Sequence, residues 1–130
     1  MATRHQVRQA VISLLYAKEM GSEMKEFTDE FLKEKKIRND QKKFTQSLFL
    51  GINEHLNEID EKLDELLKER DISQIGIIER AILRLGAYEI LFTDTDSAVI
   101  INEGIELAKE MGSDSAPKFV NAVLDAIKNA

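Results

Sequence analysis

The stretch from Ile77 to Phe92, IIERAILRLGAYEILF, constrains the fold more than any other part of the chain. Its only charged residues are Glu79, Arg80, Arg84 and Glu89. Apolar side chains would therefore cover almost the whole circumference of a helix built from it. A helix of this kind is buried, which requires other helices on most of its sides. The stretch predicts the central helix of an all-helical domain.

The length and composition fit a single soluble globular domain. The chain has 130 residues, enough for one domain with a real hydrophobic core. Its single proline argues against long turn-rich tracts, and no apolar run approaches the length of a membrane span. The first residues lack the apolar core of a signal peptide, and there is no cysteine. We therefore expect a cytoplasmic protein without disulfides or thiolate metal sites.

The charge of the chain is acidic overall but unevenly distributed. The formal net charge is -6 and the pI is about 5.0, which argues against tight, autonomous binding of nucleic acid. Residues 33–43, however, hold six Lys and Arg residues against two acids, and residues 1–20 hold three against one. The acidic excess lies in residues 53–69, with seven acids against two lysines. The net charge can therefore mask a local anion-binding face in the N-terminal part.

Hydrophobic periodicity predicts helices throughout the chain and no strand of any length. The expected helices cover residues 3–20, 23–35, 41–70, 74–92, 97–111 and 116–128. The long third helix is expected to bend or break at Gly51 or in the polar run 57–60. Asp71 marks the best boundary between two packed helical subdomains. We therefore expect one all-α domain of about seven helices, with subdomains 1–70 and 71–130 around the central helix.

The same periodicity predicts the buried faces and the ends of these helices. The residues expected on buried faces are Val7, Val11 and Leu14; Met24, Phe27 and Phe31; Ala98, Ile101, Ile105 and Ala108; and Phe119, Val120, Val123, Leu124 and Ile127. The expected helix starts are capped by Asn39 or Asp40, by Asp96 or Ser97, and by Ser115. Glycines are expected to end two helices, at Gly21 and Gly112.

Arg4, Arg8, Ile12 and Tyr16 recur at a strict spacing of four on the first expected helix. Residues four apart are neighbours on a helix surface, so these four would form a strip beside the buried face. If the arginines pair with the acidic middle of the chain, the strip has only a structural role. If they do not, the strip suits RNA or a partner protein, with arginine for phosphate and tyrosine for stacking or burial. The residues alone leave both interpretations open.

Arg80 and Arg84 form a like-charge pair four residues apart on the central helix and would repel each other if left alone. We expect Glu89, Glu103 or Glu106 to neutralise them. The functional alternative is that the two arginines contact an anionic or acidic partner.

The sequence shows no catalytic or metal-binding pattern. It has no glycine-rich phosphate loop, no Gly-x-Ser-x-Gly elbow and no cysteine–histidine metal spacing. Its two histidines, His5 and His55, lack the Glu-x-x-His spacing of helical di-iron sites, so both are expected at the surface. We therefore expect a protein that is not an enzyme and that binds no cofactor and no metal.

Three C-terminal motifs and the start of the first helix carry a family resemblance. The motifs are IIERAILRLGAYEIL, VIINEGIELAKEMG and KFVNAVLDAI, and the first helix reads RxxxRxAVISLLY from Arg4. Together they resemble the NusB family of bacterial transcription antitermination factors, over essentially the whole chain. The resemblance implies an all-helical fold of two packed bundles and a role without catalysis.

The resemblance also implies partners and site residues. NusB-like proteins pair with NusE, which is also a protein of the small ribosomal subunit, and the pair binds the boxA sequence in nascent RNA. Within the elongation complex of RNA polymerase and other Nus factors, the pair promotes read-through of terminators, notably in ribosomal RNA synthesis. The positions that match the family's RNA-binding regions are Arg4, His5, Arg8, Ser115, Lys118 and Phe119. The positions that match its NusE contact are Tyr16 and Glu79.

Departures from the family pattern affect the expected strength of RNA binding. His5 and Gln6 stand where arginines are common, and Ser115 stands where an acidic residue is common. We therefore expect weak RNA binding by the chain alone, with NusE supplying much of the affinity. The rival interpretation is a helical adaptor or oligomerisation protein that never touches RNA. A charge reversal at Arg8 is expected to separate the two, and exposed apolar residues such as Ile12 would suit either a monomer or a homodimer.

Overall fold

The computed structural model describes residues 2–68 and 71–130, and within these ranges the chain forms seven α-helices, one 3-10 turn and no strand. The elements are α1 (Arg4–Glu19), α2 (Met24–Glu34), α3 (Asn39–Glu54), α4 (Leu56–Leu66), the 3-10 turn η1 (Ile72–Gln74), α5 (Ile77–Phe92), α6 (Ser97–Met111) and α7 (Ala116–Asn129). The predicted all-α class with about seven helices is confirmed. None of the described helices has the length and apolar character needed to cross a membrane.

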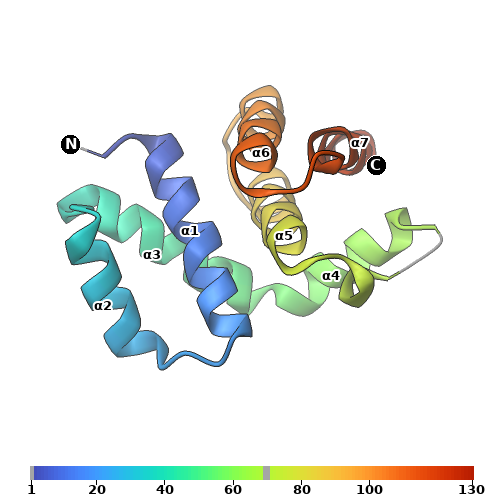
Figure 1. Cartoon of the computed structure of the whole chain (residues 1–130). Helices are drawn as coiled ribbons and strands as arrows, with labels where there is room; N and C mark the ends of the chain where they lie inside the picture. The colour runs from blue at the N-terminus through green and yellow to red at the C-terminus, as the bar shows by residue number, and fades with distance from the viewer. Residues whose placement is uncertain (1, 69–70) are drawn as a thin grey trace.

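The helices form two groups that meet along α1 and α5. In Figure 1, α1, α2 and α3 occupy one side, α4 to α7 occupy the other, and α6 lies between α1 and α7. By packing, α4 groups with the C-terminal helices, because it lies mainly on α5 and α7 although it precedes residue 70. Helix α4 ends at Leu66, before the predicted end near residue 70, which itself lies outside the described residues.

Helix α5 is the central helix, as predicted. It packs against α1, α3, α4, α6 and α7, and it buries Ala81, Ile82, Leu83 and Leu85 among other residues. It begins at Ile77, later than expected, because the preceding residues form the separate turn η1. A helix with neighbours on so many sides needs apolar side chains around most of its circumference.

The long helix predicted for residues 41–70 is divided at His55, where α3 ends and α4 begins. The division lies between the two predicted break points, Gly51 and the polar run 57–60. Gly51 lies inside α3, where a Cβ atom would collide with the ring of Tyr88, so glycine at this position lets Tyr88 of α5 lie directly against α3. At the actual break the imidazole of His55 stacks on Phe92, with ring centroids 4.1 Å apart. Contacts with α5 therefore accompany the change of direction.

The exposed strip predicted on α1 is wrong for its two middle residues. Arg8 is 2% exposed and Ile12 is fully buried, while Arg4 and Tyr16 at the ends of the strip are exposed. The buried face of α1 is therefore wider than the periodicity indicated, because α1 packs on both α3 and α5. Ile12 is not available to a homodimer interface.

The predicted buried faces of α2 and α6 need smaller corrections. On α2, Leu32 is the buried residue, while Phe27 and Phe31 are half-buried and stack on each other at 5.6 Å between ring centroids. On α6, Ala98 is exposed, and Ile100 turns inward instead. The differences are one residue on α2 and two on α6, and each residue rotates the side-chain direction by about 100°, which is enough to exchange buried for exposed positions.

The predicted helix ends are confirmed for α1 and α6, but the cap predicted at Asn39 or Asp40 is wrong, because both residues lie inside α3. Asp96 accepts a hydrogen bond from the backbone N–H of Ala98 at 2.8 Å and so caps α6, and Gly112 follows its last residue. Gly21, with a left-handed φ of 84°, follows α1. Ser115 occupies the position before α7, but its side chain makes no capping hydrogen bond.

Two glycines allow α7 to approach α5 and α6 closely. The side chain of Leu124 on α7 is fully buried and lies against Gly86 on α5 and Gly104 on α6. A Cβ atom at Gly86 would lie 2.7 Å from either methyl carbon of Leu124, and one at Gly104 would lie 2.8 Å from one of them. Leu124 thus fills a space that exists only because both facing residues lack a side chain.

Candidate functional site

Arg8 forms a buried ion pair that joins α1 to α5. Its Nε donates to Glu89 Oε2 at 3.0 Å and its Nη2 donates to Glu89 Oε1 at 2.9 Å, with both side chains 2% exposed. Glu103 Oε1 on α6 lies 3.7 Å from Arg8 Nη1. This geometry places Arg8 inside the core rather than on an RNA-facing surface. A charge reversal at Arg8 would place a buried carboxylate beside those of Glu89 and Glu103, so it cannot test RNA binding with the fold intact.

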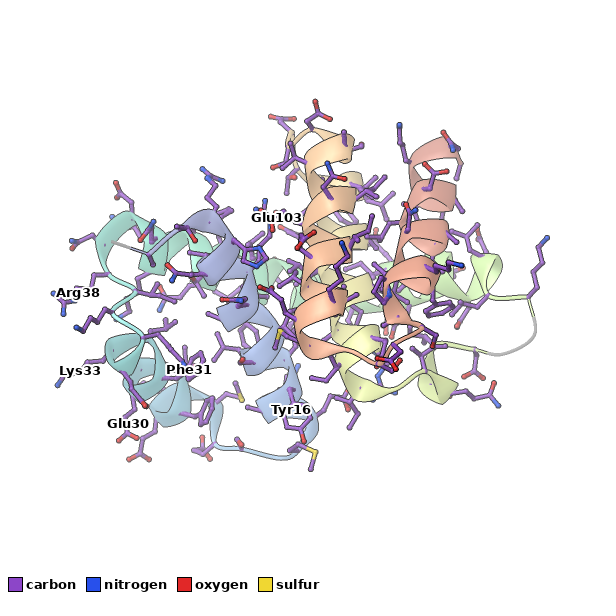
Figure 2. All side chains as sticks on the ribbon, turned by 45° about the horizontal axis from the view of Figure 1, so that its top comes forward. Tyr16, Glu30, Phe31, Lys33, Arg38 and Glu103 are labelled. Carbon is purple, nitrogen blue, oxygen red and sulfur yellow. The ribbon has the colours of Figure 1, made fainter. Side chains whose placement is uncertain are left out.

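His5 is half-buried and held by two carboxylates of α6, not free at the surface as expected. Its Nδ1 contacts Glu103, and its Nε2 lies 2.6 Å from Glu110 Oε1. Both ring nitrogens can donate only when the imidazole is protonated. Figure 2 shows Glu103 on the side of α6 that faces α1. Glu103 thus contacts both His5 and Arg8, and these ion pairs hold the start of α1 against α6.

The stability of the protein is expected to depend on pH through His5. Burial alone lowers the pKa of His5, but the hydrogen bonds and charges of Glu103 and Glu110 outweigh burial and raise the pKa above its ordinary 6.5. The folded protein therefore holds this proton more tightly than the unfolded chain. The resulting stability is fully present below about pH 6.5 and is lost as the pH rises through the folded pKa.

Urea denaturation at several pH values from 6 to 9 measures this effect. We expect the wild-type protein to lose at most about 1 kcal/mol over this pH range, because the cluster is partly screened by solvent. The variant His5→Asn is expected to lose this pH dependence, while the control Glu106→Gln, which alters an exposed carboxylate on the same helix, is expected to keep it. An unchanged slope in His5→Asn would contradict the assignment.

Arg4 is the one member of the N-terminal trio Arg4, His5 and Arg8 that remains open to solvent. Its guanidinium carbon lies 4.4 Å from the centroid of the Phe44 ring on α3, a cation–π contact that steadies the side chain and leaves the donors free. The side chain of Gln41 at the start of α3 donates to the backbone carbonyl of Ala2. The start of α1 is therefore ordered by α3 on one side and by α6 on the other.

The second predicted RNA-facing segment lies at the start of α7, on the other side of α6 (Figure 1). Ser115 and Lys118 are exposed there. Phe119 is half-buried, packs against the main hydrophobic core and lines a hollow of about 390 Å³ with Leu66 and Val123. Of the cations predicted to contact RNA, Arg4 and Lys118 are thus exposed, and they belong to helices on opposite sides of α6.

The two residues expected to contact NusE differ in their surroundings. Tyr16 is 41% exposed on α1. Glu79 is half-buried at the start of α5, and its Oε1 accepts a hydrogen bond from the backbone N–H of Ser113 at 3.2 Å. Burial alone would raise the pKa of Glu79, but the hydrogen bonds from Ser113 and from its own backbone N–H lower it below the ordinary value. Glu79 therefore holds the turn between α6 and α7.

The partners of Arg80 and Arg84 are not the glutamates that were expected. Arg84 pairs with Asp60 on α4, Nη2 to Oδ2 at 2.8 Å, and with Glu19 on α1, Nη1 to Oε1 at 3.0 Å. Arg80 lies 3.5 Å from the same Glu19 carboxylate. The pKa of Arg84 is raised because these carboxylates outweigh the opposing effect of burial. The repulsion between the two arginines is thus relieved by carboxylates from α1 and α4.

Periodicity did not identify Glu19 or Asp60 as partners of Arg84, and it did not identify the partners of His5, which are Glu103 and Glu110. The last two are seven residues apart, and therefore share a face of α6. That spacing was the available signal for a cation held between them, but nothing local indicates that the cation comes from residue 5.

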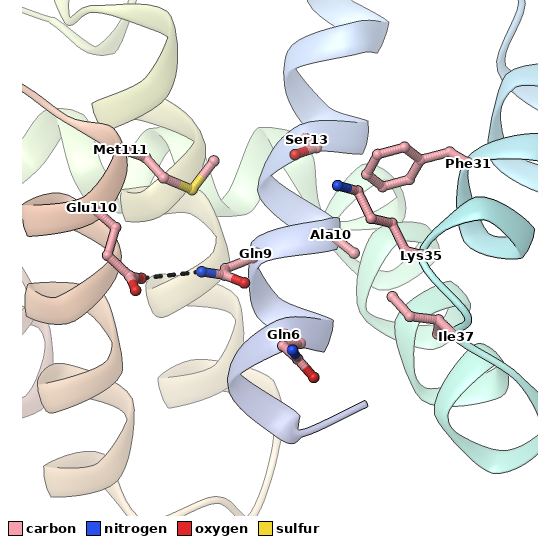
Figure 3. A pocket seen from close by; sticks show the side chains of 9 residues that line it. All are labelled: Gln6, Gln9, Ala10, Ser13, Phe31, Lys35, Ile37, Glu110 and Met111. Carbon is pink, nitrogen blue, oxygen red and sulfur yellow. Dashed lines mark hydrogen bonds between the residues drawn. The ribbon is translucent and has the colours of Figure 1, made fainter. Parts of the chain in front are cut away.

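A groove opens between the two helix groups (Figure 3). It has a volume of about 370 Å³ and is lined on α1 by Gln6, Gln9 and Ser13. Gln9 Nε2 donates to Glu110 Oε1 across it at 3.3 Å, and Met111 provides apolar surface. Among the described residues no group of three or more histidine or carboxylate side chains is placed to hold a metal ion.

These features define a class of small all-helical proteins that expose basic side chains around a packed core. The model of the NusB family matches residues 5–129, so the chain belongs to the NusB family. It is 68% identical over 128 residues to the transcription antitermination protein NusB of Campylobacter curvus, an alignment that covers 98% of each chain.

Two solved structures have the same fold. NusB of T. maritima gives a TM-score of 0.90 at 31% identity, covering 98% of this chain and 92% of that one. A structure of the antitermination factors NusB and NusE in complex with double-stranded RNA contains a chain with a TM-score of 0.84 at 30% identity, covering 97% of this chain and 96% of that one.

Proposed function

We propose that this protein is a non-catalytic transcription antitermination factor that pairs with NusE and binds boxA RNA. The pair would act in the elongation complex with RNA polymerase and other Nus factors, notably during ribosomal RNA synthesis. The observation that carries the proposal is the close structural match, over nearly the whole chain, to a NusB protein crystallised with NusE and RNA. The family membership and the 68% identity to a named antitermination protein support it.

The exposed cations are the proposed direct contacts with RNA. Arg4 and Lys118 can donate to phosphate oxygens, and the exposed hydroxyl of Ser115 can do the same. We assign His5 and Arg8 an indirect role, because their bonds to Glu103, Glu110 and Glu89 hold the start of α1 in place. Phe119, which packs into the core, would offer at most a ring edge to a base.

The proposed NusE surface lies at the far end of α1. Glu19 binds Arg80 and Arg84, so the last turns of α1 are held against the first turns of α5. These helix ends carry Tyr16 and Glu79. An exposed phenol combines apolar area with a hydrogen-bonding tip, which favours a role at a protein interface. Glu79 would act there chiefly by fixing the adjoining α6–α7 turn.

The charge reversal Arg4→Glu is expected to weaken binding of boxA RNA at least about tenfold, because a hydrogen bond to a charged group contributes about 1.5–3 kcal/mol. The slope of log affinity against log salt concentration should also decrease by about 0.7 for one lost single-strand contact. Fluorescence anisotropy with the NusE complex at several salt concentrations measures both. The variant should fold normally because Arg4 is exposed.

The matched control is Lys128→Glu, which reverses an exposed charge at the other end of α7 from Lys118 and should bind RNA nearly as the wild type does. Titrations with and without NusE then test whether NusE supplies much of the affinity, and equal affinities would refute that part. If the wild-type complex shows no preference for boxA RNA, the adaptor without RNA binding becomes the better interpretation.

A further inference from the structure

A cluster of basic residues gathers where α2 ends and α3 begins. The six residues, called here the α2–α3 basic corner, are Lys33, Lys35, Lys36, Arg38, Lys42 and Lys43. Among the described residues none of the six lies within 4.0 Å of a carboxylate, whereas Arg8, Arg80 and Arg84 are all paired. The same segment holds only two carboxylates, Glu34 and Asp40, so the corner has a net excess of four positive charges (six minus two).

The charge of the corner is displayed to solvent. All six side chains are exposed except that of Lys42, which is half-buried. Lys33 and Arg38 point away from the body of the molecule in Figure 2. Lys36 and Arg38 line a hollow of about 640 Å³ together with Asn39, Asp40 and Gln41. These cations therefore contribute little to holding the fold together, in contrast to the paired arginines of α1 and α5.

The position of the cluster is unfavourable for the free protein. Arg38, rather than the expected Asn39 or Asp40, precedes the first helical residue of α3, and it makes no capping hydrogen bond. The amino end of a helix carries a partial positive charge, which favours Asp40 in the first turn of α3 but repels Lys42 at the end of that turn. A bound polyanion would relieve both this repulsion and the repulsion among the six cations.

The corner is continuous with the start of α1. Gln41 is bonded to the backbone carbonyl of Ala2, and Arg4 lies over Phe44 in the next turn of α3. The basic surface therefore runs from the proposed RNA contact at Arg4 along the first turns of α3 to the corner. The surface is positively charged, exposed and continuous with Arg4, so we expect it to bind the same polyanion as Arg4.

We propose that the α2–α3 basic corner is a second, sequence-independent RNA surface, which binds the phosphates of single-stranded nucleotides flanking the boxA segment. The inference rests on the proposed function, because it extends the path of an RNA bound at Arg4. Lysines on flexible stems suit such contacts, since phosphate contacts position a nucleic acid without reading its sequence. An overall acidic protein would in this way hold a longer RNA than its specific site alone covers.

The test compares two RNAs and two triple variants, each in complex with NusE. One RNA is boxA alone, and the other is boxA with single-stranded uridine flanks of about ten nucleotides on both sides. The corner triple is Lys36→Gln, Arg38→Gln and Lys42→Gln. The control triple, Lys25→Gln, Lys109→Gln and Lys128→Gln, removes the same charge from exposed positions elsewhere.

We expect all three proteins to bind boxA alone with similar affinity, and only the corner triple to lose affinity for the flanked RNA. Three lost single-strand contacts at about 0.7 each would reduce the salt slope by about 2. The ratio of the wild-type affinity to the affinity of the corner triple, both for the flanked RNA, should then fall about 20-fold as the salt concentration rises from 50 to 200 mM. The corner triple should melt no lower than the wild type, because its substitutions remove mutually repelling charges.

Two results would overturn the inference while leaving the proposed function intact. One is a wild-type complex that binds the flanked RNA no more tightly than boxA alone, as expected if the corner instead binds an acidic protein. The other is a control triple that loses as much affinity as the corner triple, which would show that the loss comes from the net charge of the protein and not from the position of the corner. If the wild-type complex fails to bind boxA at all, the proposed function fails and the inference fails with it.

Discussion

Replacing Arg8 with methionine is expected to lower the free energy of unfolding by about 3–5 kcal/mol. The substitution leaves the carboxylate of Glu89, which is 2% exposed, without the two hydrogen bonds of 3.0 and 2.9 Å that Arg8 donates. A buried charge without a partner costs more than the lost contact alone. Since small domains are stable by only about 5–15 kcal/mol, the loss is a large fraction of the total. Urea denaturation followed by circular dichroism measures it.

A double-mutant cycle separates the ion pair from packing. The double variant Arg8→Met/Glu89→Leu is expected to recover most of the lost stability, because apolar side chains can replace a buried ion pair with little cost. The coupling free energy between the two sites should then exceed about 1 kcal/mol. Arg4→Met is the matched control, since it removes an exposed arginine four residues earlier on the same helix. The assignment is wrong if Arg8→Met costs no more than this control.

Shortening Leu124 to alanine is expected to cost about 2–5 kcal/mol. The side chain is fully buried and fills the space left by Gly86 and Gly104 where α7 meets α5 and α6. Three helices meet at this point, so the structure cannot easily collapse into the cavity that the substitution creates. Thermal and urea denaturation measure the loss of stability.

The converse variant tests the same space from the opposite side. Gly86→Ala is expected to cost about 1–3 kcal/mol, because its Cβ atom would lie 2.7 Å from Leu124 methyl carbons. In the double variant Gly86→Ala/Leu124→Ala, the new methyl group enters the cavity, so the total loss should be smaller than the sum of the single losses. Strict additivity would show that the two residues do not share the space.

Much of the fold was predictable because apolar periodicity reports burial directly. The near-continuous apolar character of residues 77–92 predicted the central position of α5, and the motifs on α5, α6 and α7 predicted the family. The division at His55 was not predictable in this way. It involves no glycine or proline at the break, and the visible contact is a stack on Phe92, which is distant in sequence.

The charged site was harder to predict than the core. A spacing of four showed that Arg4, Arg8 and Ile12 share a strip, but not how far the buried face of α1 extends around the helix. Ile12 inside the strip was the signal that its middle is buried. The partners of Arg8 and His5 lie on α5 and α6, so only the tertiary fold brings the charges together.

The ion pair between Arg8 and Glu89 joins residues 81 positions apart, so it cannot form until the ribosome has synthesised both of them. At about 5–20 residues per second, the ribosome needs on the order of 4–16 s to travel from one to the other. During that interval α1 can meet α2 and α3, but the buried arginine has no counter-ion and His5 still lacks Glu103 and Glu110. The ribosome makes the start of α1 first, and the nascent chain is expected to lock it into place only after α5 and α6 have emerged.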